Sequence, residues 1–329
     1  MTDLASGAAV AIITRTRDRR LLLPRAIASV AAQSFTDYVH VIVNDGGSTA
    51  EVENAVQASG AARARTSIID ITTSSGLEAA SNVGIAQSRS EFVAIHDDDD
   101  SWHPDFLKNT VEVLRRTSAA GVVTSMDCVL EDLVDGAIVE TGRMPYGPDL
   151  KDVSLFRQLE NNELTPIGFL FRRDAYESLG QYDESLPVTG DWEFGIRFLR
   201  HFDVEYLAHE PRLAHYHHRP AVLGGPLGNS VFASRAAHDH FLNKTRNRML
   251  REDLDAGRFG LGSLMALQHQ ILANRDLLRS LTHDRALQTE AVRQELLAAI
   301  RSKPSIVARV VRRLRRMRRG GGGGGGGGG

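Results

Sequence analysis

The stretch that decides the fold is a short apolar run that passes directly into four consecutive aspartates: Val93-Ala94-Ile95-His96-Asp97-Asp98-Asp99-Asp100-Ser101-Trp102-His103-Pro104. The apolar run predicts a buried strand, and Pro104 suits the first turn of a following helix. Adjacent carboxylates repel one another, so their pKa values rise unless a cation or hydrogen-bond donors compensate. A solvated acidic turn is one interpretation. The carboxyl end of a buried strand is where open α/β sheets bind ligands, however, which favours a divalent metal site.

The composition is that of a globular protein without internal disulfides. The chain has 329 residues, of which 42% are hydrophobic and 24% are charged, and its single cysteine is Cys128. A lone cysteine suits a reducing compartment. The sequence contains no apolar run of the roughly 20 residues needed to span a bilayer, and residues 1–7 lack the pattern of a signal peptide. We therefore expect a cytoplasmic protein.

Charge is distributed unevenly along the chain. Residues 301–319 hold nine of the 39 basic residues and no acidic ones, which leaves 30 basic against 41 acidic side chains elsewhere. An acidic body is a poor nucleic-acid binder, because neutralisation of phosphates drives that affinity. Apolar residues recur at helical spacing among the arginines of residues 304–319, which predicts a basic amphipathic helix at an anionic membrane surface. Nucleic-acid contact and an ordinary solvated chain end are the alternatives. Residues 320–329 are a glycine run that predicts a disordered tail.

Strands and helices are predicted to alternate through the first part of the chain. The predicted strands are residues 10–14, 38–43, 67–71, 92–95 and 122–125. This alternation predicts a mostly parallel, doubly wound sheet with helices on both faces, and therefore an α/β fold. In that architecture the loops after Ile13, Val43 and Ile95 meet at one edge of the sheet. Thr14, Asp45 and the acidic run should then share one crevice.

The alternation ends near Cys128. A hairpin is predicted around Asp135-Gly136, a short helix over residues 152–159 and a strand over residues 169–171. Residues 229–301 are predicted to be mostly helical. They carry no catalytic constellation, so we interpret them as a packing or assembly surface, which leaves oligomer formation open.

Two further groups of polar residues are candidates for function. Asp191 lies at the start of an amphipathic segment, where a carboxylate serves either as a helix N-cap or in a reaction. Three histidines, His215, His217 and His218, fall within four residues. Clustered histidines are good metal ligands near neutral pH, which favours a functional interpretation over a structural one.

Three stretches together resemble the family 2 glycosyltransferases: residues 10–16, 41–48 and 92–104. The resemblance extends from residue 10 to about residue 220, and it implies the GT-A fold. The implied organisation is a nucleotide-sugar-binding half over residues 1–126, an acceptor-binding half over 127–220, a helical extension over 221–303, the basic helix over 304–319 and the tail over 320–329. It also implies inverting transfer of a sugar from a nucleoside diphosphate donor, UDP- or dTDP-linked, with Mn²⁺ or Mg²⁺ as cofactor, in the synthesis of bacterial surface polysaccharide.

The resemblance also implies a role for individual residues. Asp191 corresponds to the catalytic base. The metal ligands correspond to Asp99 and Asp97, with a further ligand from His217 or its competitor His215. The donor-binding residues correspond to Thr14, Arg15, Thr16, Asn44, Asp45, Gly46, Asn82, Asp97 and Asp98. In this scheme a carboxylate of the Asn44-Asp45 pair accepts a hydrogen bond from the nucleotide base.

Two positions depart from the family pattern. Ser81 stands in Ala80-Ser81-Asn82, where an arginine near the nucleotide is usual, and Arg15, Arg17 or another basic side chain is a candidate to replace it. Gly190 stands before Asp191, where a glutamate is usual, which removes a carboxylate that could orient the acceptor or the metal.

The chemistry of sugar transfer accounts for these residue types. A metal stabilises the charge that builds on the departing diphosphate, and a carboxylate removes the proton of the attacking hydroxyl from the opposite face, which predicts inversion. The basic segment at residues 304–319 suggests a lipid-linked oligosaccharide as acceptor, held at the inner face of the cell membrane; another glycan is the alternative. The competing functions are a nucleotidyltransferase, a non-catalytic nucleotide- or sugar-binding module, and a structural protein whose acidic loop binds calcium.

Overall fold

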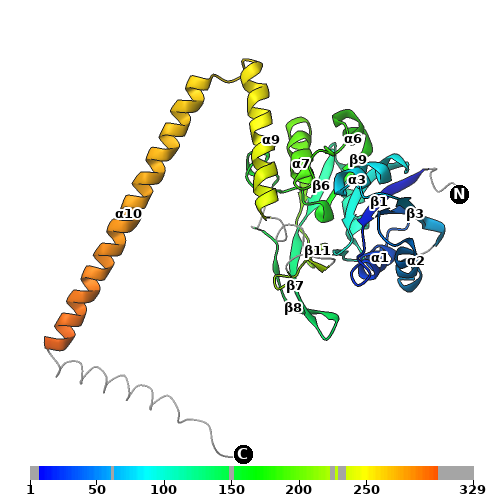
Figure 1. The fold of residues 1–329 in the computed structure, drawn as a ribbon, viewed down its shortest axis with the longest axis horizontal. Helices are drawn as coiled ribbons and strands as arrows, with labels where there is room; N and C mark the ends of the chain where they lie inside the picture. The colour runs from blue at the N-terminus through cyan, green and yellow to red at the C-terminus, as the bar shows by residue number, and fades with distance from the viewer. Residues whose placement is uncertain (1–6, 61–62, 148–151, 223–226, 229–234, 303–329) are drawn as a thin grey trace, which may run out of the picture. The chain divides into compact units, whose positions relative to one another are not determined.

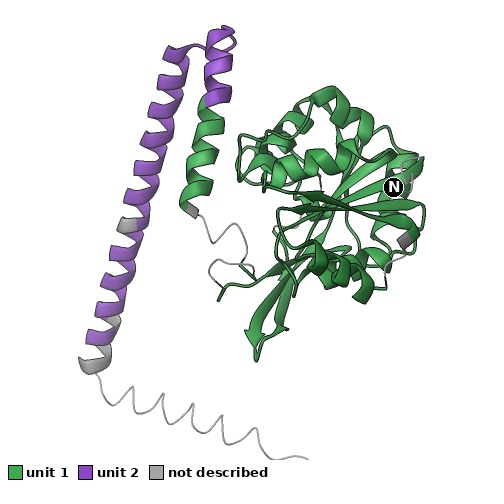
Figure 2. Cartoon of the chain, turned by 45° about the vertical axis from the view of Figure 1, so that its right-hand side comes forward, with its two compact units in different colours: residues 1–247 green, residues 248–329 purple. Residues whose placement is uncertain are grey.

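The computed structural model describes residues 7–60, 63–147, 152–222, 227–228 and 235–302 (Figure 1). The chain divides into two compact units, residues 1–247 and 248–329 (Figure 2). The predicted basic helix over 304–319 and the glycine tail lie outside the described residues. Within the described residues, no helix combines the length and the apolar character needed to cross a membrane. The boundaries predicted at residues 126, 220 and 303 stay predictions.

The first unit is built around a seven-stranded sheet with the order β10-β6-β9-β4-β1-β2-β3. Its strands are β1 (Ala8–Thr16), β2 (Tyr38–Asp45), β3 (Thr66–Ile71), β4 (Ser90–Asp97), β6 (Gly121–Thr124), β9 (Phe169–Arg172) and β10 (Val204–Leu207). Neighbouring strands are parallel except at β9, which runs antiparallel to both β4 and β6. The predicted mostly parallel α/β sheet is confirmed. The insertion of β9 between β4 and β6 was not predicted.

Helices cover both faces of this sheet. They are α1 (Leu23–Ala31), α2 (Thr49–Ala58), α3 (Leu77–Ala86), α4 (Phe106–Arg116), α5 (Leu155–Gln158), α6 (Arg173–Leu179) and α7 (Gly190–His201), with the short 3₁₀ turns η1 (Arg63–Arg65) and η2 (Pro166–Gly168). In Figure 1, α6 and α7 lie on one side of the sheet and α1 and α2 on the other. Alternate residues of β1 accordingly belong to different cores, Val10 and Ile12 to one and Ala11 and Ile13 to the other. Burial on both faces explains the continuous apolar runs of the central strands.

A second, four-stranded sheet has the order β5-β11-β7-β8. Its strands are β5 (Ser101–Trp102), β7 (Met126–Val134), β8 (Ala137–Pro145) and β11 (Ala214–His218). The predicted hairpin is β7–β8, and Asp135 and Gly136 form its turn with φ values of 51° and 80°. The pairing of Trp102 with Ala214 joins β5 to β11 and was not predicted. As a result, the acidic run connects the two sheets, because β4 precedes it and β5 follows it.

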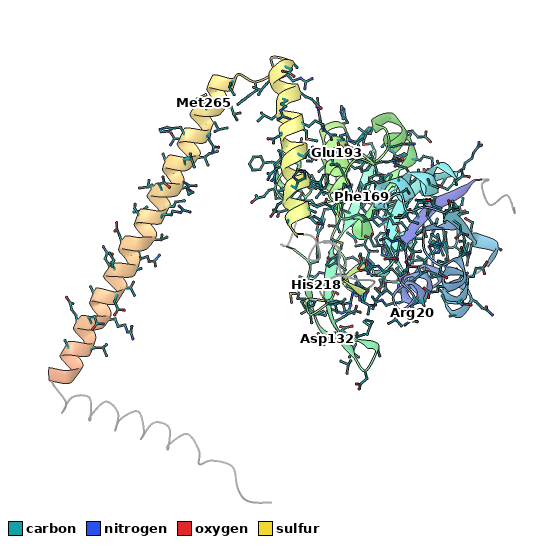
Figure 3. The ribbon with its side chains drawn as sticks, in the orientation of Figure 1. Arg20, Asp132, Phe169, Glu193, His218 and Met265 are labelled. Atoms are coloured by element: carbon teal, nitrogen blue, oxygen red, sulfur yellow. The ribbon has the colours of Figure 1, made fainter. Side chains whose placement is uncertain are left out.

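The chain continues into two long helices, α9 (Arg235–Asp255) and α10 (Leu261–Ser302). The boundary between the two compact units falls within α9, and α10 belongs to the second unit. The helical extension predicted for this region is confirmed. Apolar side chains of α10 are exposed: Met265, which extends from the helix in Figure 3, is 65% exposed, whereas Phe169 within the first unit is 3% exposed.

Helix α3 packs closely on β1 at Gly84. A Cβ atom at this position would lie 2.4 Å from Ile13 Cγ2 and 3.1 Å from Val43 Cγ2. Gly84→Ala should therefore lower the free energy of unfolding by about 1–3 kcal/mol, because the branched side chains below must shift. Urea unfolding of the whole chain measures this. The control is Gly142→Ala in β8, where the nearest atom, Leu130 Cδ1, is 3.7 Å away; equal losses for the two variants would contradict the packing explanation.

Candidate active site

Two adjoining cavities open at the carboxyl edge of the large sheet. The arginine cavity, of about 620 Å³, is lined by the loop after β1 and by the segment before α3, and it includes Arg15, Arg17 and Arg19. The aspartate cavity, of about 370 Å³, is lined by the acidic run and by the start of α7, and it includes Asp97–Asp100 and Asp191. Arg15, Arg19, Leu77 and Asp98 line both cavities. The predicted convergence of loops at this edge is therefore present.

The arginine cavity is lined by three arginines and by three aspartates, Asp18, Asp45 and Asp98. Its three arginines alternate with Thr16 and Asp18 over residues 15–19, at the end of β1 and in the loop that follows it. Arg17 donates a hydrogen bond to Ser74 Oγ at 2.7 Å, which ties this loop to the segment before α3. Planar guanidinium groups present paired donors that match phosphate oxygens. The cavity can therefore hold a diphosphate.

Asp45 lines the arginine cavity but already has hydrogen-bond donors on both carboxylate oxygens. Oδ1 accepts from the backbone N–H of Ser75 at 2.6 Å, and Oδ2 accepts from the N–H of Gly76 at 3.0 Å and from the Ser74 hydroxyl at 2.8 Å. Burial alone would raise the pKa of Asp45, but these hydrogen bonds lower it below its ordinary value. The carboxylate thus holds the loop before α3. Gly46, with φ of 79°, allows that loop to approach, because a Cβ there would lie 2.8 Å from Ser74 N.

Besides Gly46, three residues of the predicted donor site line neither cavity. Thr14 Oγ1 lies 2.9 Å from His40 Nε2, inside the sheet packing. Asn44 donates to the Gly47 carbonyl at 2.9 Å, and Asn82 donates to the Tyr182 carbonyl at 3.0 Å. All three are buried. The structure therefore brings Arg15, Thr16 and Asp45 together with the acidic run, but it places Thr14, Asn44 and Asn82 in supporting positions.

Each carboxylate of the acidic run has a different partner. Asp97 Oδ1 accepts from Arg15 at 2.6 Å, Asp98 Oδ1 lies 3.8 Å from Arg19 Nε, Asp99 pairs with Arg219, and Asp100 Oδ1 accepts from the backbone N–H of His217 at 2.8 Å. Burial raises the pKa of Asp98 to about 7 and that of Asp100 well above its ordinary value, and the charge of Asp99 adds to both shifts. The run therefore contains the electrostatic repulsion that its sequence predicts.

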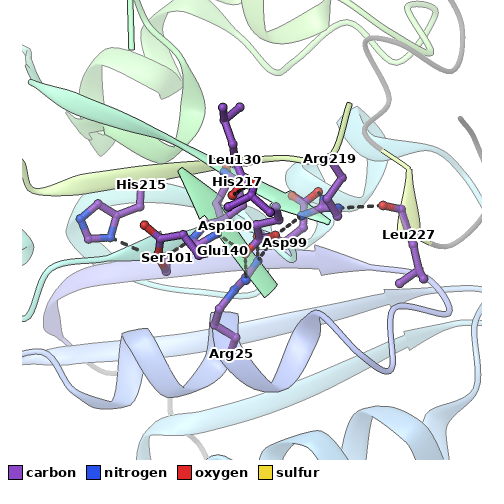
Figure 4. Close-up of polar contacts among 12 residues, drawn as sticks. Arg25, Asp99, Asp100, Ser101, Leu130, Glu140, His215, His217, Arg219 and Leu227 are labelled. Carbon is purple, nitrogen blue, oxygen red and sulfur yellow. Dashed lines mark hydrogen bonds and ion pairs between the residues drawn. The ribbon is translucent and has the colours of Figure 1, made fainter. Parts of the chain in front are cut away.

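A buried network joins Asp99 to the small sheet (Figure 4). Glu131 on β7 is 3% exposed, and its carboxylate contacts Arg25, Arg219 at 2.9 Å and His217 Nδ1 at 2.7 Å. Burial alone would raise the pKa of Glu131, but the hydrogen bond from His217 and the charge of Arg25 lower it to about 2. Arg219, which is fully buried, also pairs with Asp99. This network holds the acidic run against β7 and β11.

The two histidines predicted as metal ligands differ in their surroundings. His217 has both ring nitrogens engaged, since Nε2 lies 2.8 Å from Ser101 Oγ and Nδ1 lies 2.7 Å from Glu131. His217 could coordinate a metal only if one of these two contacts were broken. His215 is less enclosed, with Nδ1 3.4 Å from Ser101 Oγ, and burial lowers the pKa of His215 to about 4, so its ring is neutral at pH 7. Neither histidine lines the aspartate cavity, which Tyr216 between them does.

The acidic run suits a cation that also has ligands from the substrate. Across the residues that the structure describes, no group of three or more His, Cys, Asp or Glu side chains converges on one point. Mg²⁺, however, is commonly bound by one or two carboxylates together with substrate phosphates and water. The side chains of Asp97 and Asp99 are 26% and 13% exposed and line the cavity, so they can act in this way.

Asp191 lies in the first turn of α7 and lines the aspartate cavity. It is not the N-cap: that position is Thr189, whose side chain makes no capping hydrogen bond. Asp191 Oδ1 accepts from the N–H of Trp192 at 2.8 Å, and Oδ2 accepts from the Asn162 side chain at 2.9 Å. Burial raises the pKa of Asp191 above its ordinary value, although the charge of Arg15 opposes this. A fixed carboxylate with a raised pKa suits a general base.

Sequence reasoning missed five residues of this region: Arg19, Glu78, Glu131, Asn162 and Arg219. Arg19 had a signal, since it continues the alternation of Arg15 and Arg17. Glu78 falls in the first turn of α3, where a carboxylate is ordinary, so nothing marked it. Glu131 and Asn162 lie in segments whose position relative to the sheet no motif predicts.

Comparison with known proteins agrees with this geometry. The sequence pattern of the glycosyl transferase family 2 matches residues 10–180, and the chain belongs to this family. It is a glycosyltransferase. It is 23% identical over 198 residues to the uncharacterized glycosyltransferase YwdF of Bacillus subtilis (strain 168), across 60% of this chain and 70% of that protein. It is 30% identical over 178 residues to the uncharacterized glycosyltransferase alr2836 of Nostoc sp., across 53% of this chain and 54% of that protein.

Solved structures share the fold. Crystal structures of S. aureus TarS residues 1–349, alone and in complex with UDP-GlcNAc, superpose with TM-scores of 0.53 and 0.52 at 18% and 17% identity. The superposition with the first covers 64% of this chain and 60% of that one. The matched part thus spans less than two thirds of TarS 1–349 and about half of the Nostoc protein.

The network around Glu131 makes a prediction about stability. Glu131→Ala removes one of the two carboxylates that pair with the buried Arg219 and leaves a cavity in its place, so the free energy of unfolding at pH 7 should fall by about 3–5 kcal/mol. Because the folded pKa of Glu131 is about 2, its contribution is present above the unfolded pKa of about 4.3 and is lost as the pH falls toward 2. Urea unfolding at several pH values measures both effects.

The matched control is Glu140→Ala in β8, an exposed residue that pairs with Arg143. A solvated pair of this kind contributes about 1 kcal/mol or less. If Glu131→Ala cost no more than Glu140→Ala, the network would not hold the acidic run.

Proposed function

We propose that this glycosyltransferase moves a sugar from a nucleoside diphosphate donor to an acceptor hydroxyl and inverts the configuration at the sugar carbon. The supporting observation is that Asp191 and the acidic run line one cavity, which adjoins the arginine cavity. Arg15 and Arg19, which are proposed to bind phosphate, and Asp191, the proposed base, thus line the same cavity.

The arginine cavity binds the donor diphosphate in this proposal. Arg17 and Arg19 supply charge-assisted hydrogen bonds to phosphate oxygens, and Arg15 adds its positive charge to the cavity. Asp97 and Asp99 would hold a divalent cation, Mn²⁺ or Mg²⁺, which when bound supplies Lewis acidity toward the departing diphosphate. Asp45 supports the site indirectly, because it orders the loop that closes the cavity before α3.

Asp191 acts as the general base. Its carboxylate is oriented by the N–H of Trp192 and the amide of Asn162, so that it is held in the cavity wall rather than free to rotate. It accepts the proton of the acceptor hydroxyl as that oxygen attacks the sugar carbon. Attack on the face opposite the leaving diphosphate, in one displacement, accounts for inversion.

The donor is proposed from a solved structure of similar fold, and the acceptor from the basic segment of this chain. TarS has been crystallised with UDP-GlcNAc, which makes UDP-linked sugars the first donors to test, with dTDP-linked sugars next. The acceptor is a lipid-linked oligosaccharide in surface polysaccharide synthesis. This proposal rests on the basic segment over residues 304–319, which would hold the protein at the inner face of the membrane.

The first test is release of nucleoside diphosphate from a panel of UDP-, dTDP- and GDP-linked sugars with Mn²⁺, with and without glycan acceptors. Release from one donor class that is abolished by a chelator supports both the donor and the cation. Turnover of a nucleoside triphosphate to pyrophosphate would instead indicate a nucleotidyltransferase. No release, together with no nucleotide binding by calorimetry, would contradict the proposal.

Asp191→Asn should reduce kcat by at least about a thousandfold, because an amide cannot accept the hydroxyl proton. The donor Kd, measured by calorimetry, should change less than about threefold, since Asp191 removes the proton only in the transition state. Asp174→Asn on α6 is a control of the same chemistry that does not line the cavity. Transfer at the parent rate by Asp191→Asn would exclude this residue as the base.

The raised pKa of Asp191 predicts a pH dependence. The base must be ionised, so kcat/KM should fall as the pH falls through a value above the ordinary Asp pKa of about 3.9. Asn162→Ala removes a hydrogen bond that favours the charged form of Asp191. The acid limb of the pH profile, where kcat/KM falls at low pH, should therefore move to higher pH by on the order of one unit. Asn161→Ala, in the same wall, should leave the limb in place. An unmoved limb in Asn162→Ala would show that another group sets it.

A further inference from the structure

Both positions that depart from the family pattern contact one pair of charged side chains. Arg15 Nη1 donates to Ser81 Oγ at 2.8 Å and lies 3.8 Å from Glu78 Oε2. At Gly190, a Cβ atom would lie 2.5 Å from both Cδ and Oε1 of Glu78. This chain lacks the arginine at 81 and the glutamate at 190 that the family pattern has, and Arg15 from β1 and Glu78 from α3 lie beside those two positions.

Steric fit makes these substitutions dependent on one another. Arg15 is 6% exposed, Glu78 is 5% exposed and Ser81 is fully buried, so little free space surrounds the pair. A long side chain at 81 would compete with the Arg15 guanidinium for the same volume. Any side chain at 190 would collide with the Glu78 carboxylate. A small residue at each position is therefore a requirement of the Arg15–Glu78 pair.

The pair connects the acidic run to the helix that carries the base. Arg15 Nη2 donates to Asp97 Oδ1 at 2.6 Å, and the charge of Arg15 lowers the pKa of Asp191 against the effect of burial. Glu78 forms a hydrogen bond with the backbone of Gly190, the first residue of α7. The N-terminal N–H groups of a helix lack partners within the helix and favour a nearby carboxylate. The carboxyl group of Glu78 supplies an oxygen acceptor at this helix end, since the Thr189 side chain makes no cap.

Part of the pair is left without a hydrogen bond. Among the described residues, nothing donates a hydrogen bond to Glu78 Oε2, and Arg15 Nε has no acceptor, although both atoms are buried. Burial, which is the largest effect, raises the pKa of Glu78 to about 8 in spite of Arg15. An arrangement that served only stability would not keep such atoms unsatisfied, because each costs free energy. Both residues also line the aspartate cavity.

We propose that Glu78 and Arg15 are positioning residues of the transfer reaction, which together orient the first turn of α7 with Asp191 and fix Asp97 at the cavity. They do so in place of side chains at residues 190 and 81. The inference rests on the proposed function, because Asp191 must be the base for its orientation to matter to the rate.

The test is a pair of double-mutant cycles measured with the donor and acceptor that the panel identifies. The first compares the parent with Glu78→Ala, Gly190→Glu and the double variant. Glu78→Ala should lower kcat between about ten- and a hundredfold, because a small misplacement of the base costs this much, while the donor KM changes less than about threefold. Gly190→Glu alone should lose both activity and thermal stability, because it meets Glu78.

The double variant, Glu78→Ala with Gly190→Glu, tests whether the two positions depend on one another. With Glu78 removed, a glutamate at 190 can extend into the vacated space, so kcat should recover to within about fivefold of the parent and the melting temperature should rise above that of Gly190→Glu. The second cycle, with Arg15→Ala and Ser81→Arg, should show the same partial rescue. Glu53→Ala, an exposed glutamate on α2, controls for loss of a carboxylate far from the cavity.

The outcomes separate this inference from the proposed function. An inactive parent across the whole panel would overturn the proposed function and, with it, this inference. An active parent with Glu78→Ala as active as Glu53→Ala, or with single effects that simply add in the double variant, would overturn the inference alone. If Glu78→Ala fails to fold, Glu78→Gln, which keeps an acceptor for Gly190, and the melting temperatures of the second cycle supply the comparison.

Discussion

The arrangement of this protein depends on compensation of four adjacent carboxylates. Negative groups that leave water must be paired or hydrogen-bonded, and one partner cannot serve four side chains on a tight turn. The partners are therefore drawn from four separate parts of the chain: Arg15 near the end of β1, Arg19 before α1, the backbone of His217 on β11 and Arg219 beyond it. This requirement holds the two sheets together at the point where the chain passes from one to the other.

The same compensation prepares the cavity for an anionic substrate. Arg15 and Arg19 line both cavities, so each is within reach of the acidic run and of the space that a diphosphate would fill. A diphosphate adds negative charge to a region that already contains Asp97–Asp100 and Asp191. That excess is a physical reason to expect a divalent cation to enter with the donor, because arginines shared between carboxylates and phosphates cannot neutralise both.

Much of the fold was predictable from local pattern. Strands buried on both faces show continuous apolar runs, and their alternation with helices predicts the parallel sheet and the edge at which its loops meet. The antiparallel strand β9 and the small sheet were not predictable. They depend on pairings such as Val93 with Phe171 and Trp102 with Ala214, between residues far apart in the chain. No short-range periodicity contains that information.

The candidate site, like the fold, was predictable from local sequence only in part. The sequence by itself determined that the acidic run ends a buried strand, that arginines lie around the end of β1, and that Asp191 begins a helix, because backbone conformation and burial period are local properties. Only the tertiary structure decided that Asp99 meets Arg219, that Asp45 holds a loop, that Thr14 and Asn82 face the interior, and that Glu78 lies where a side chain at Gly190 would be. Those contacts depend on which surfaces pack together. The free energy of burying a charge depends on every neighbour that packing brings, not on the residue's own position in the chain.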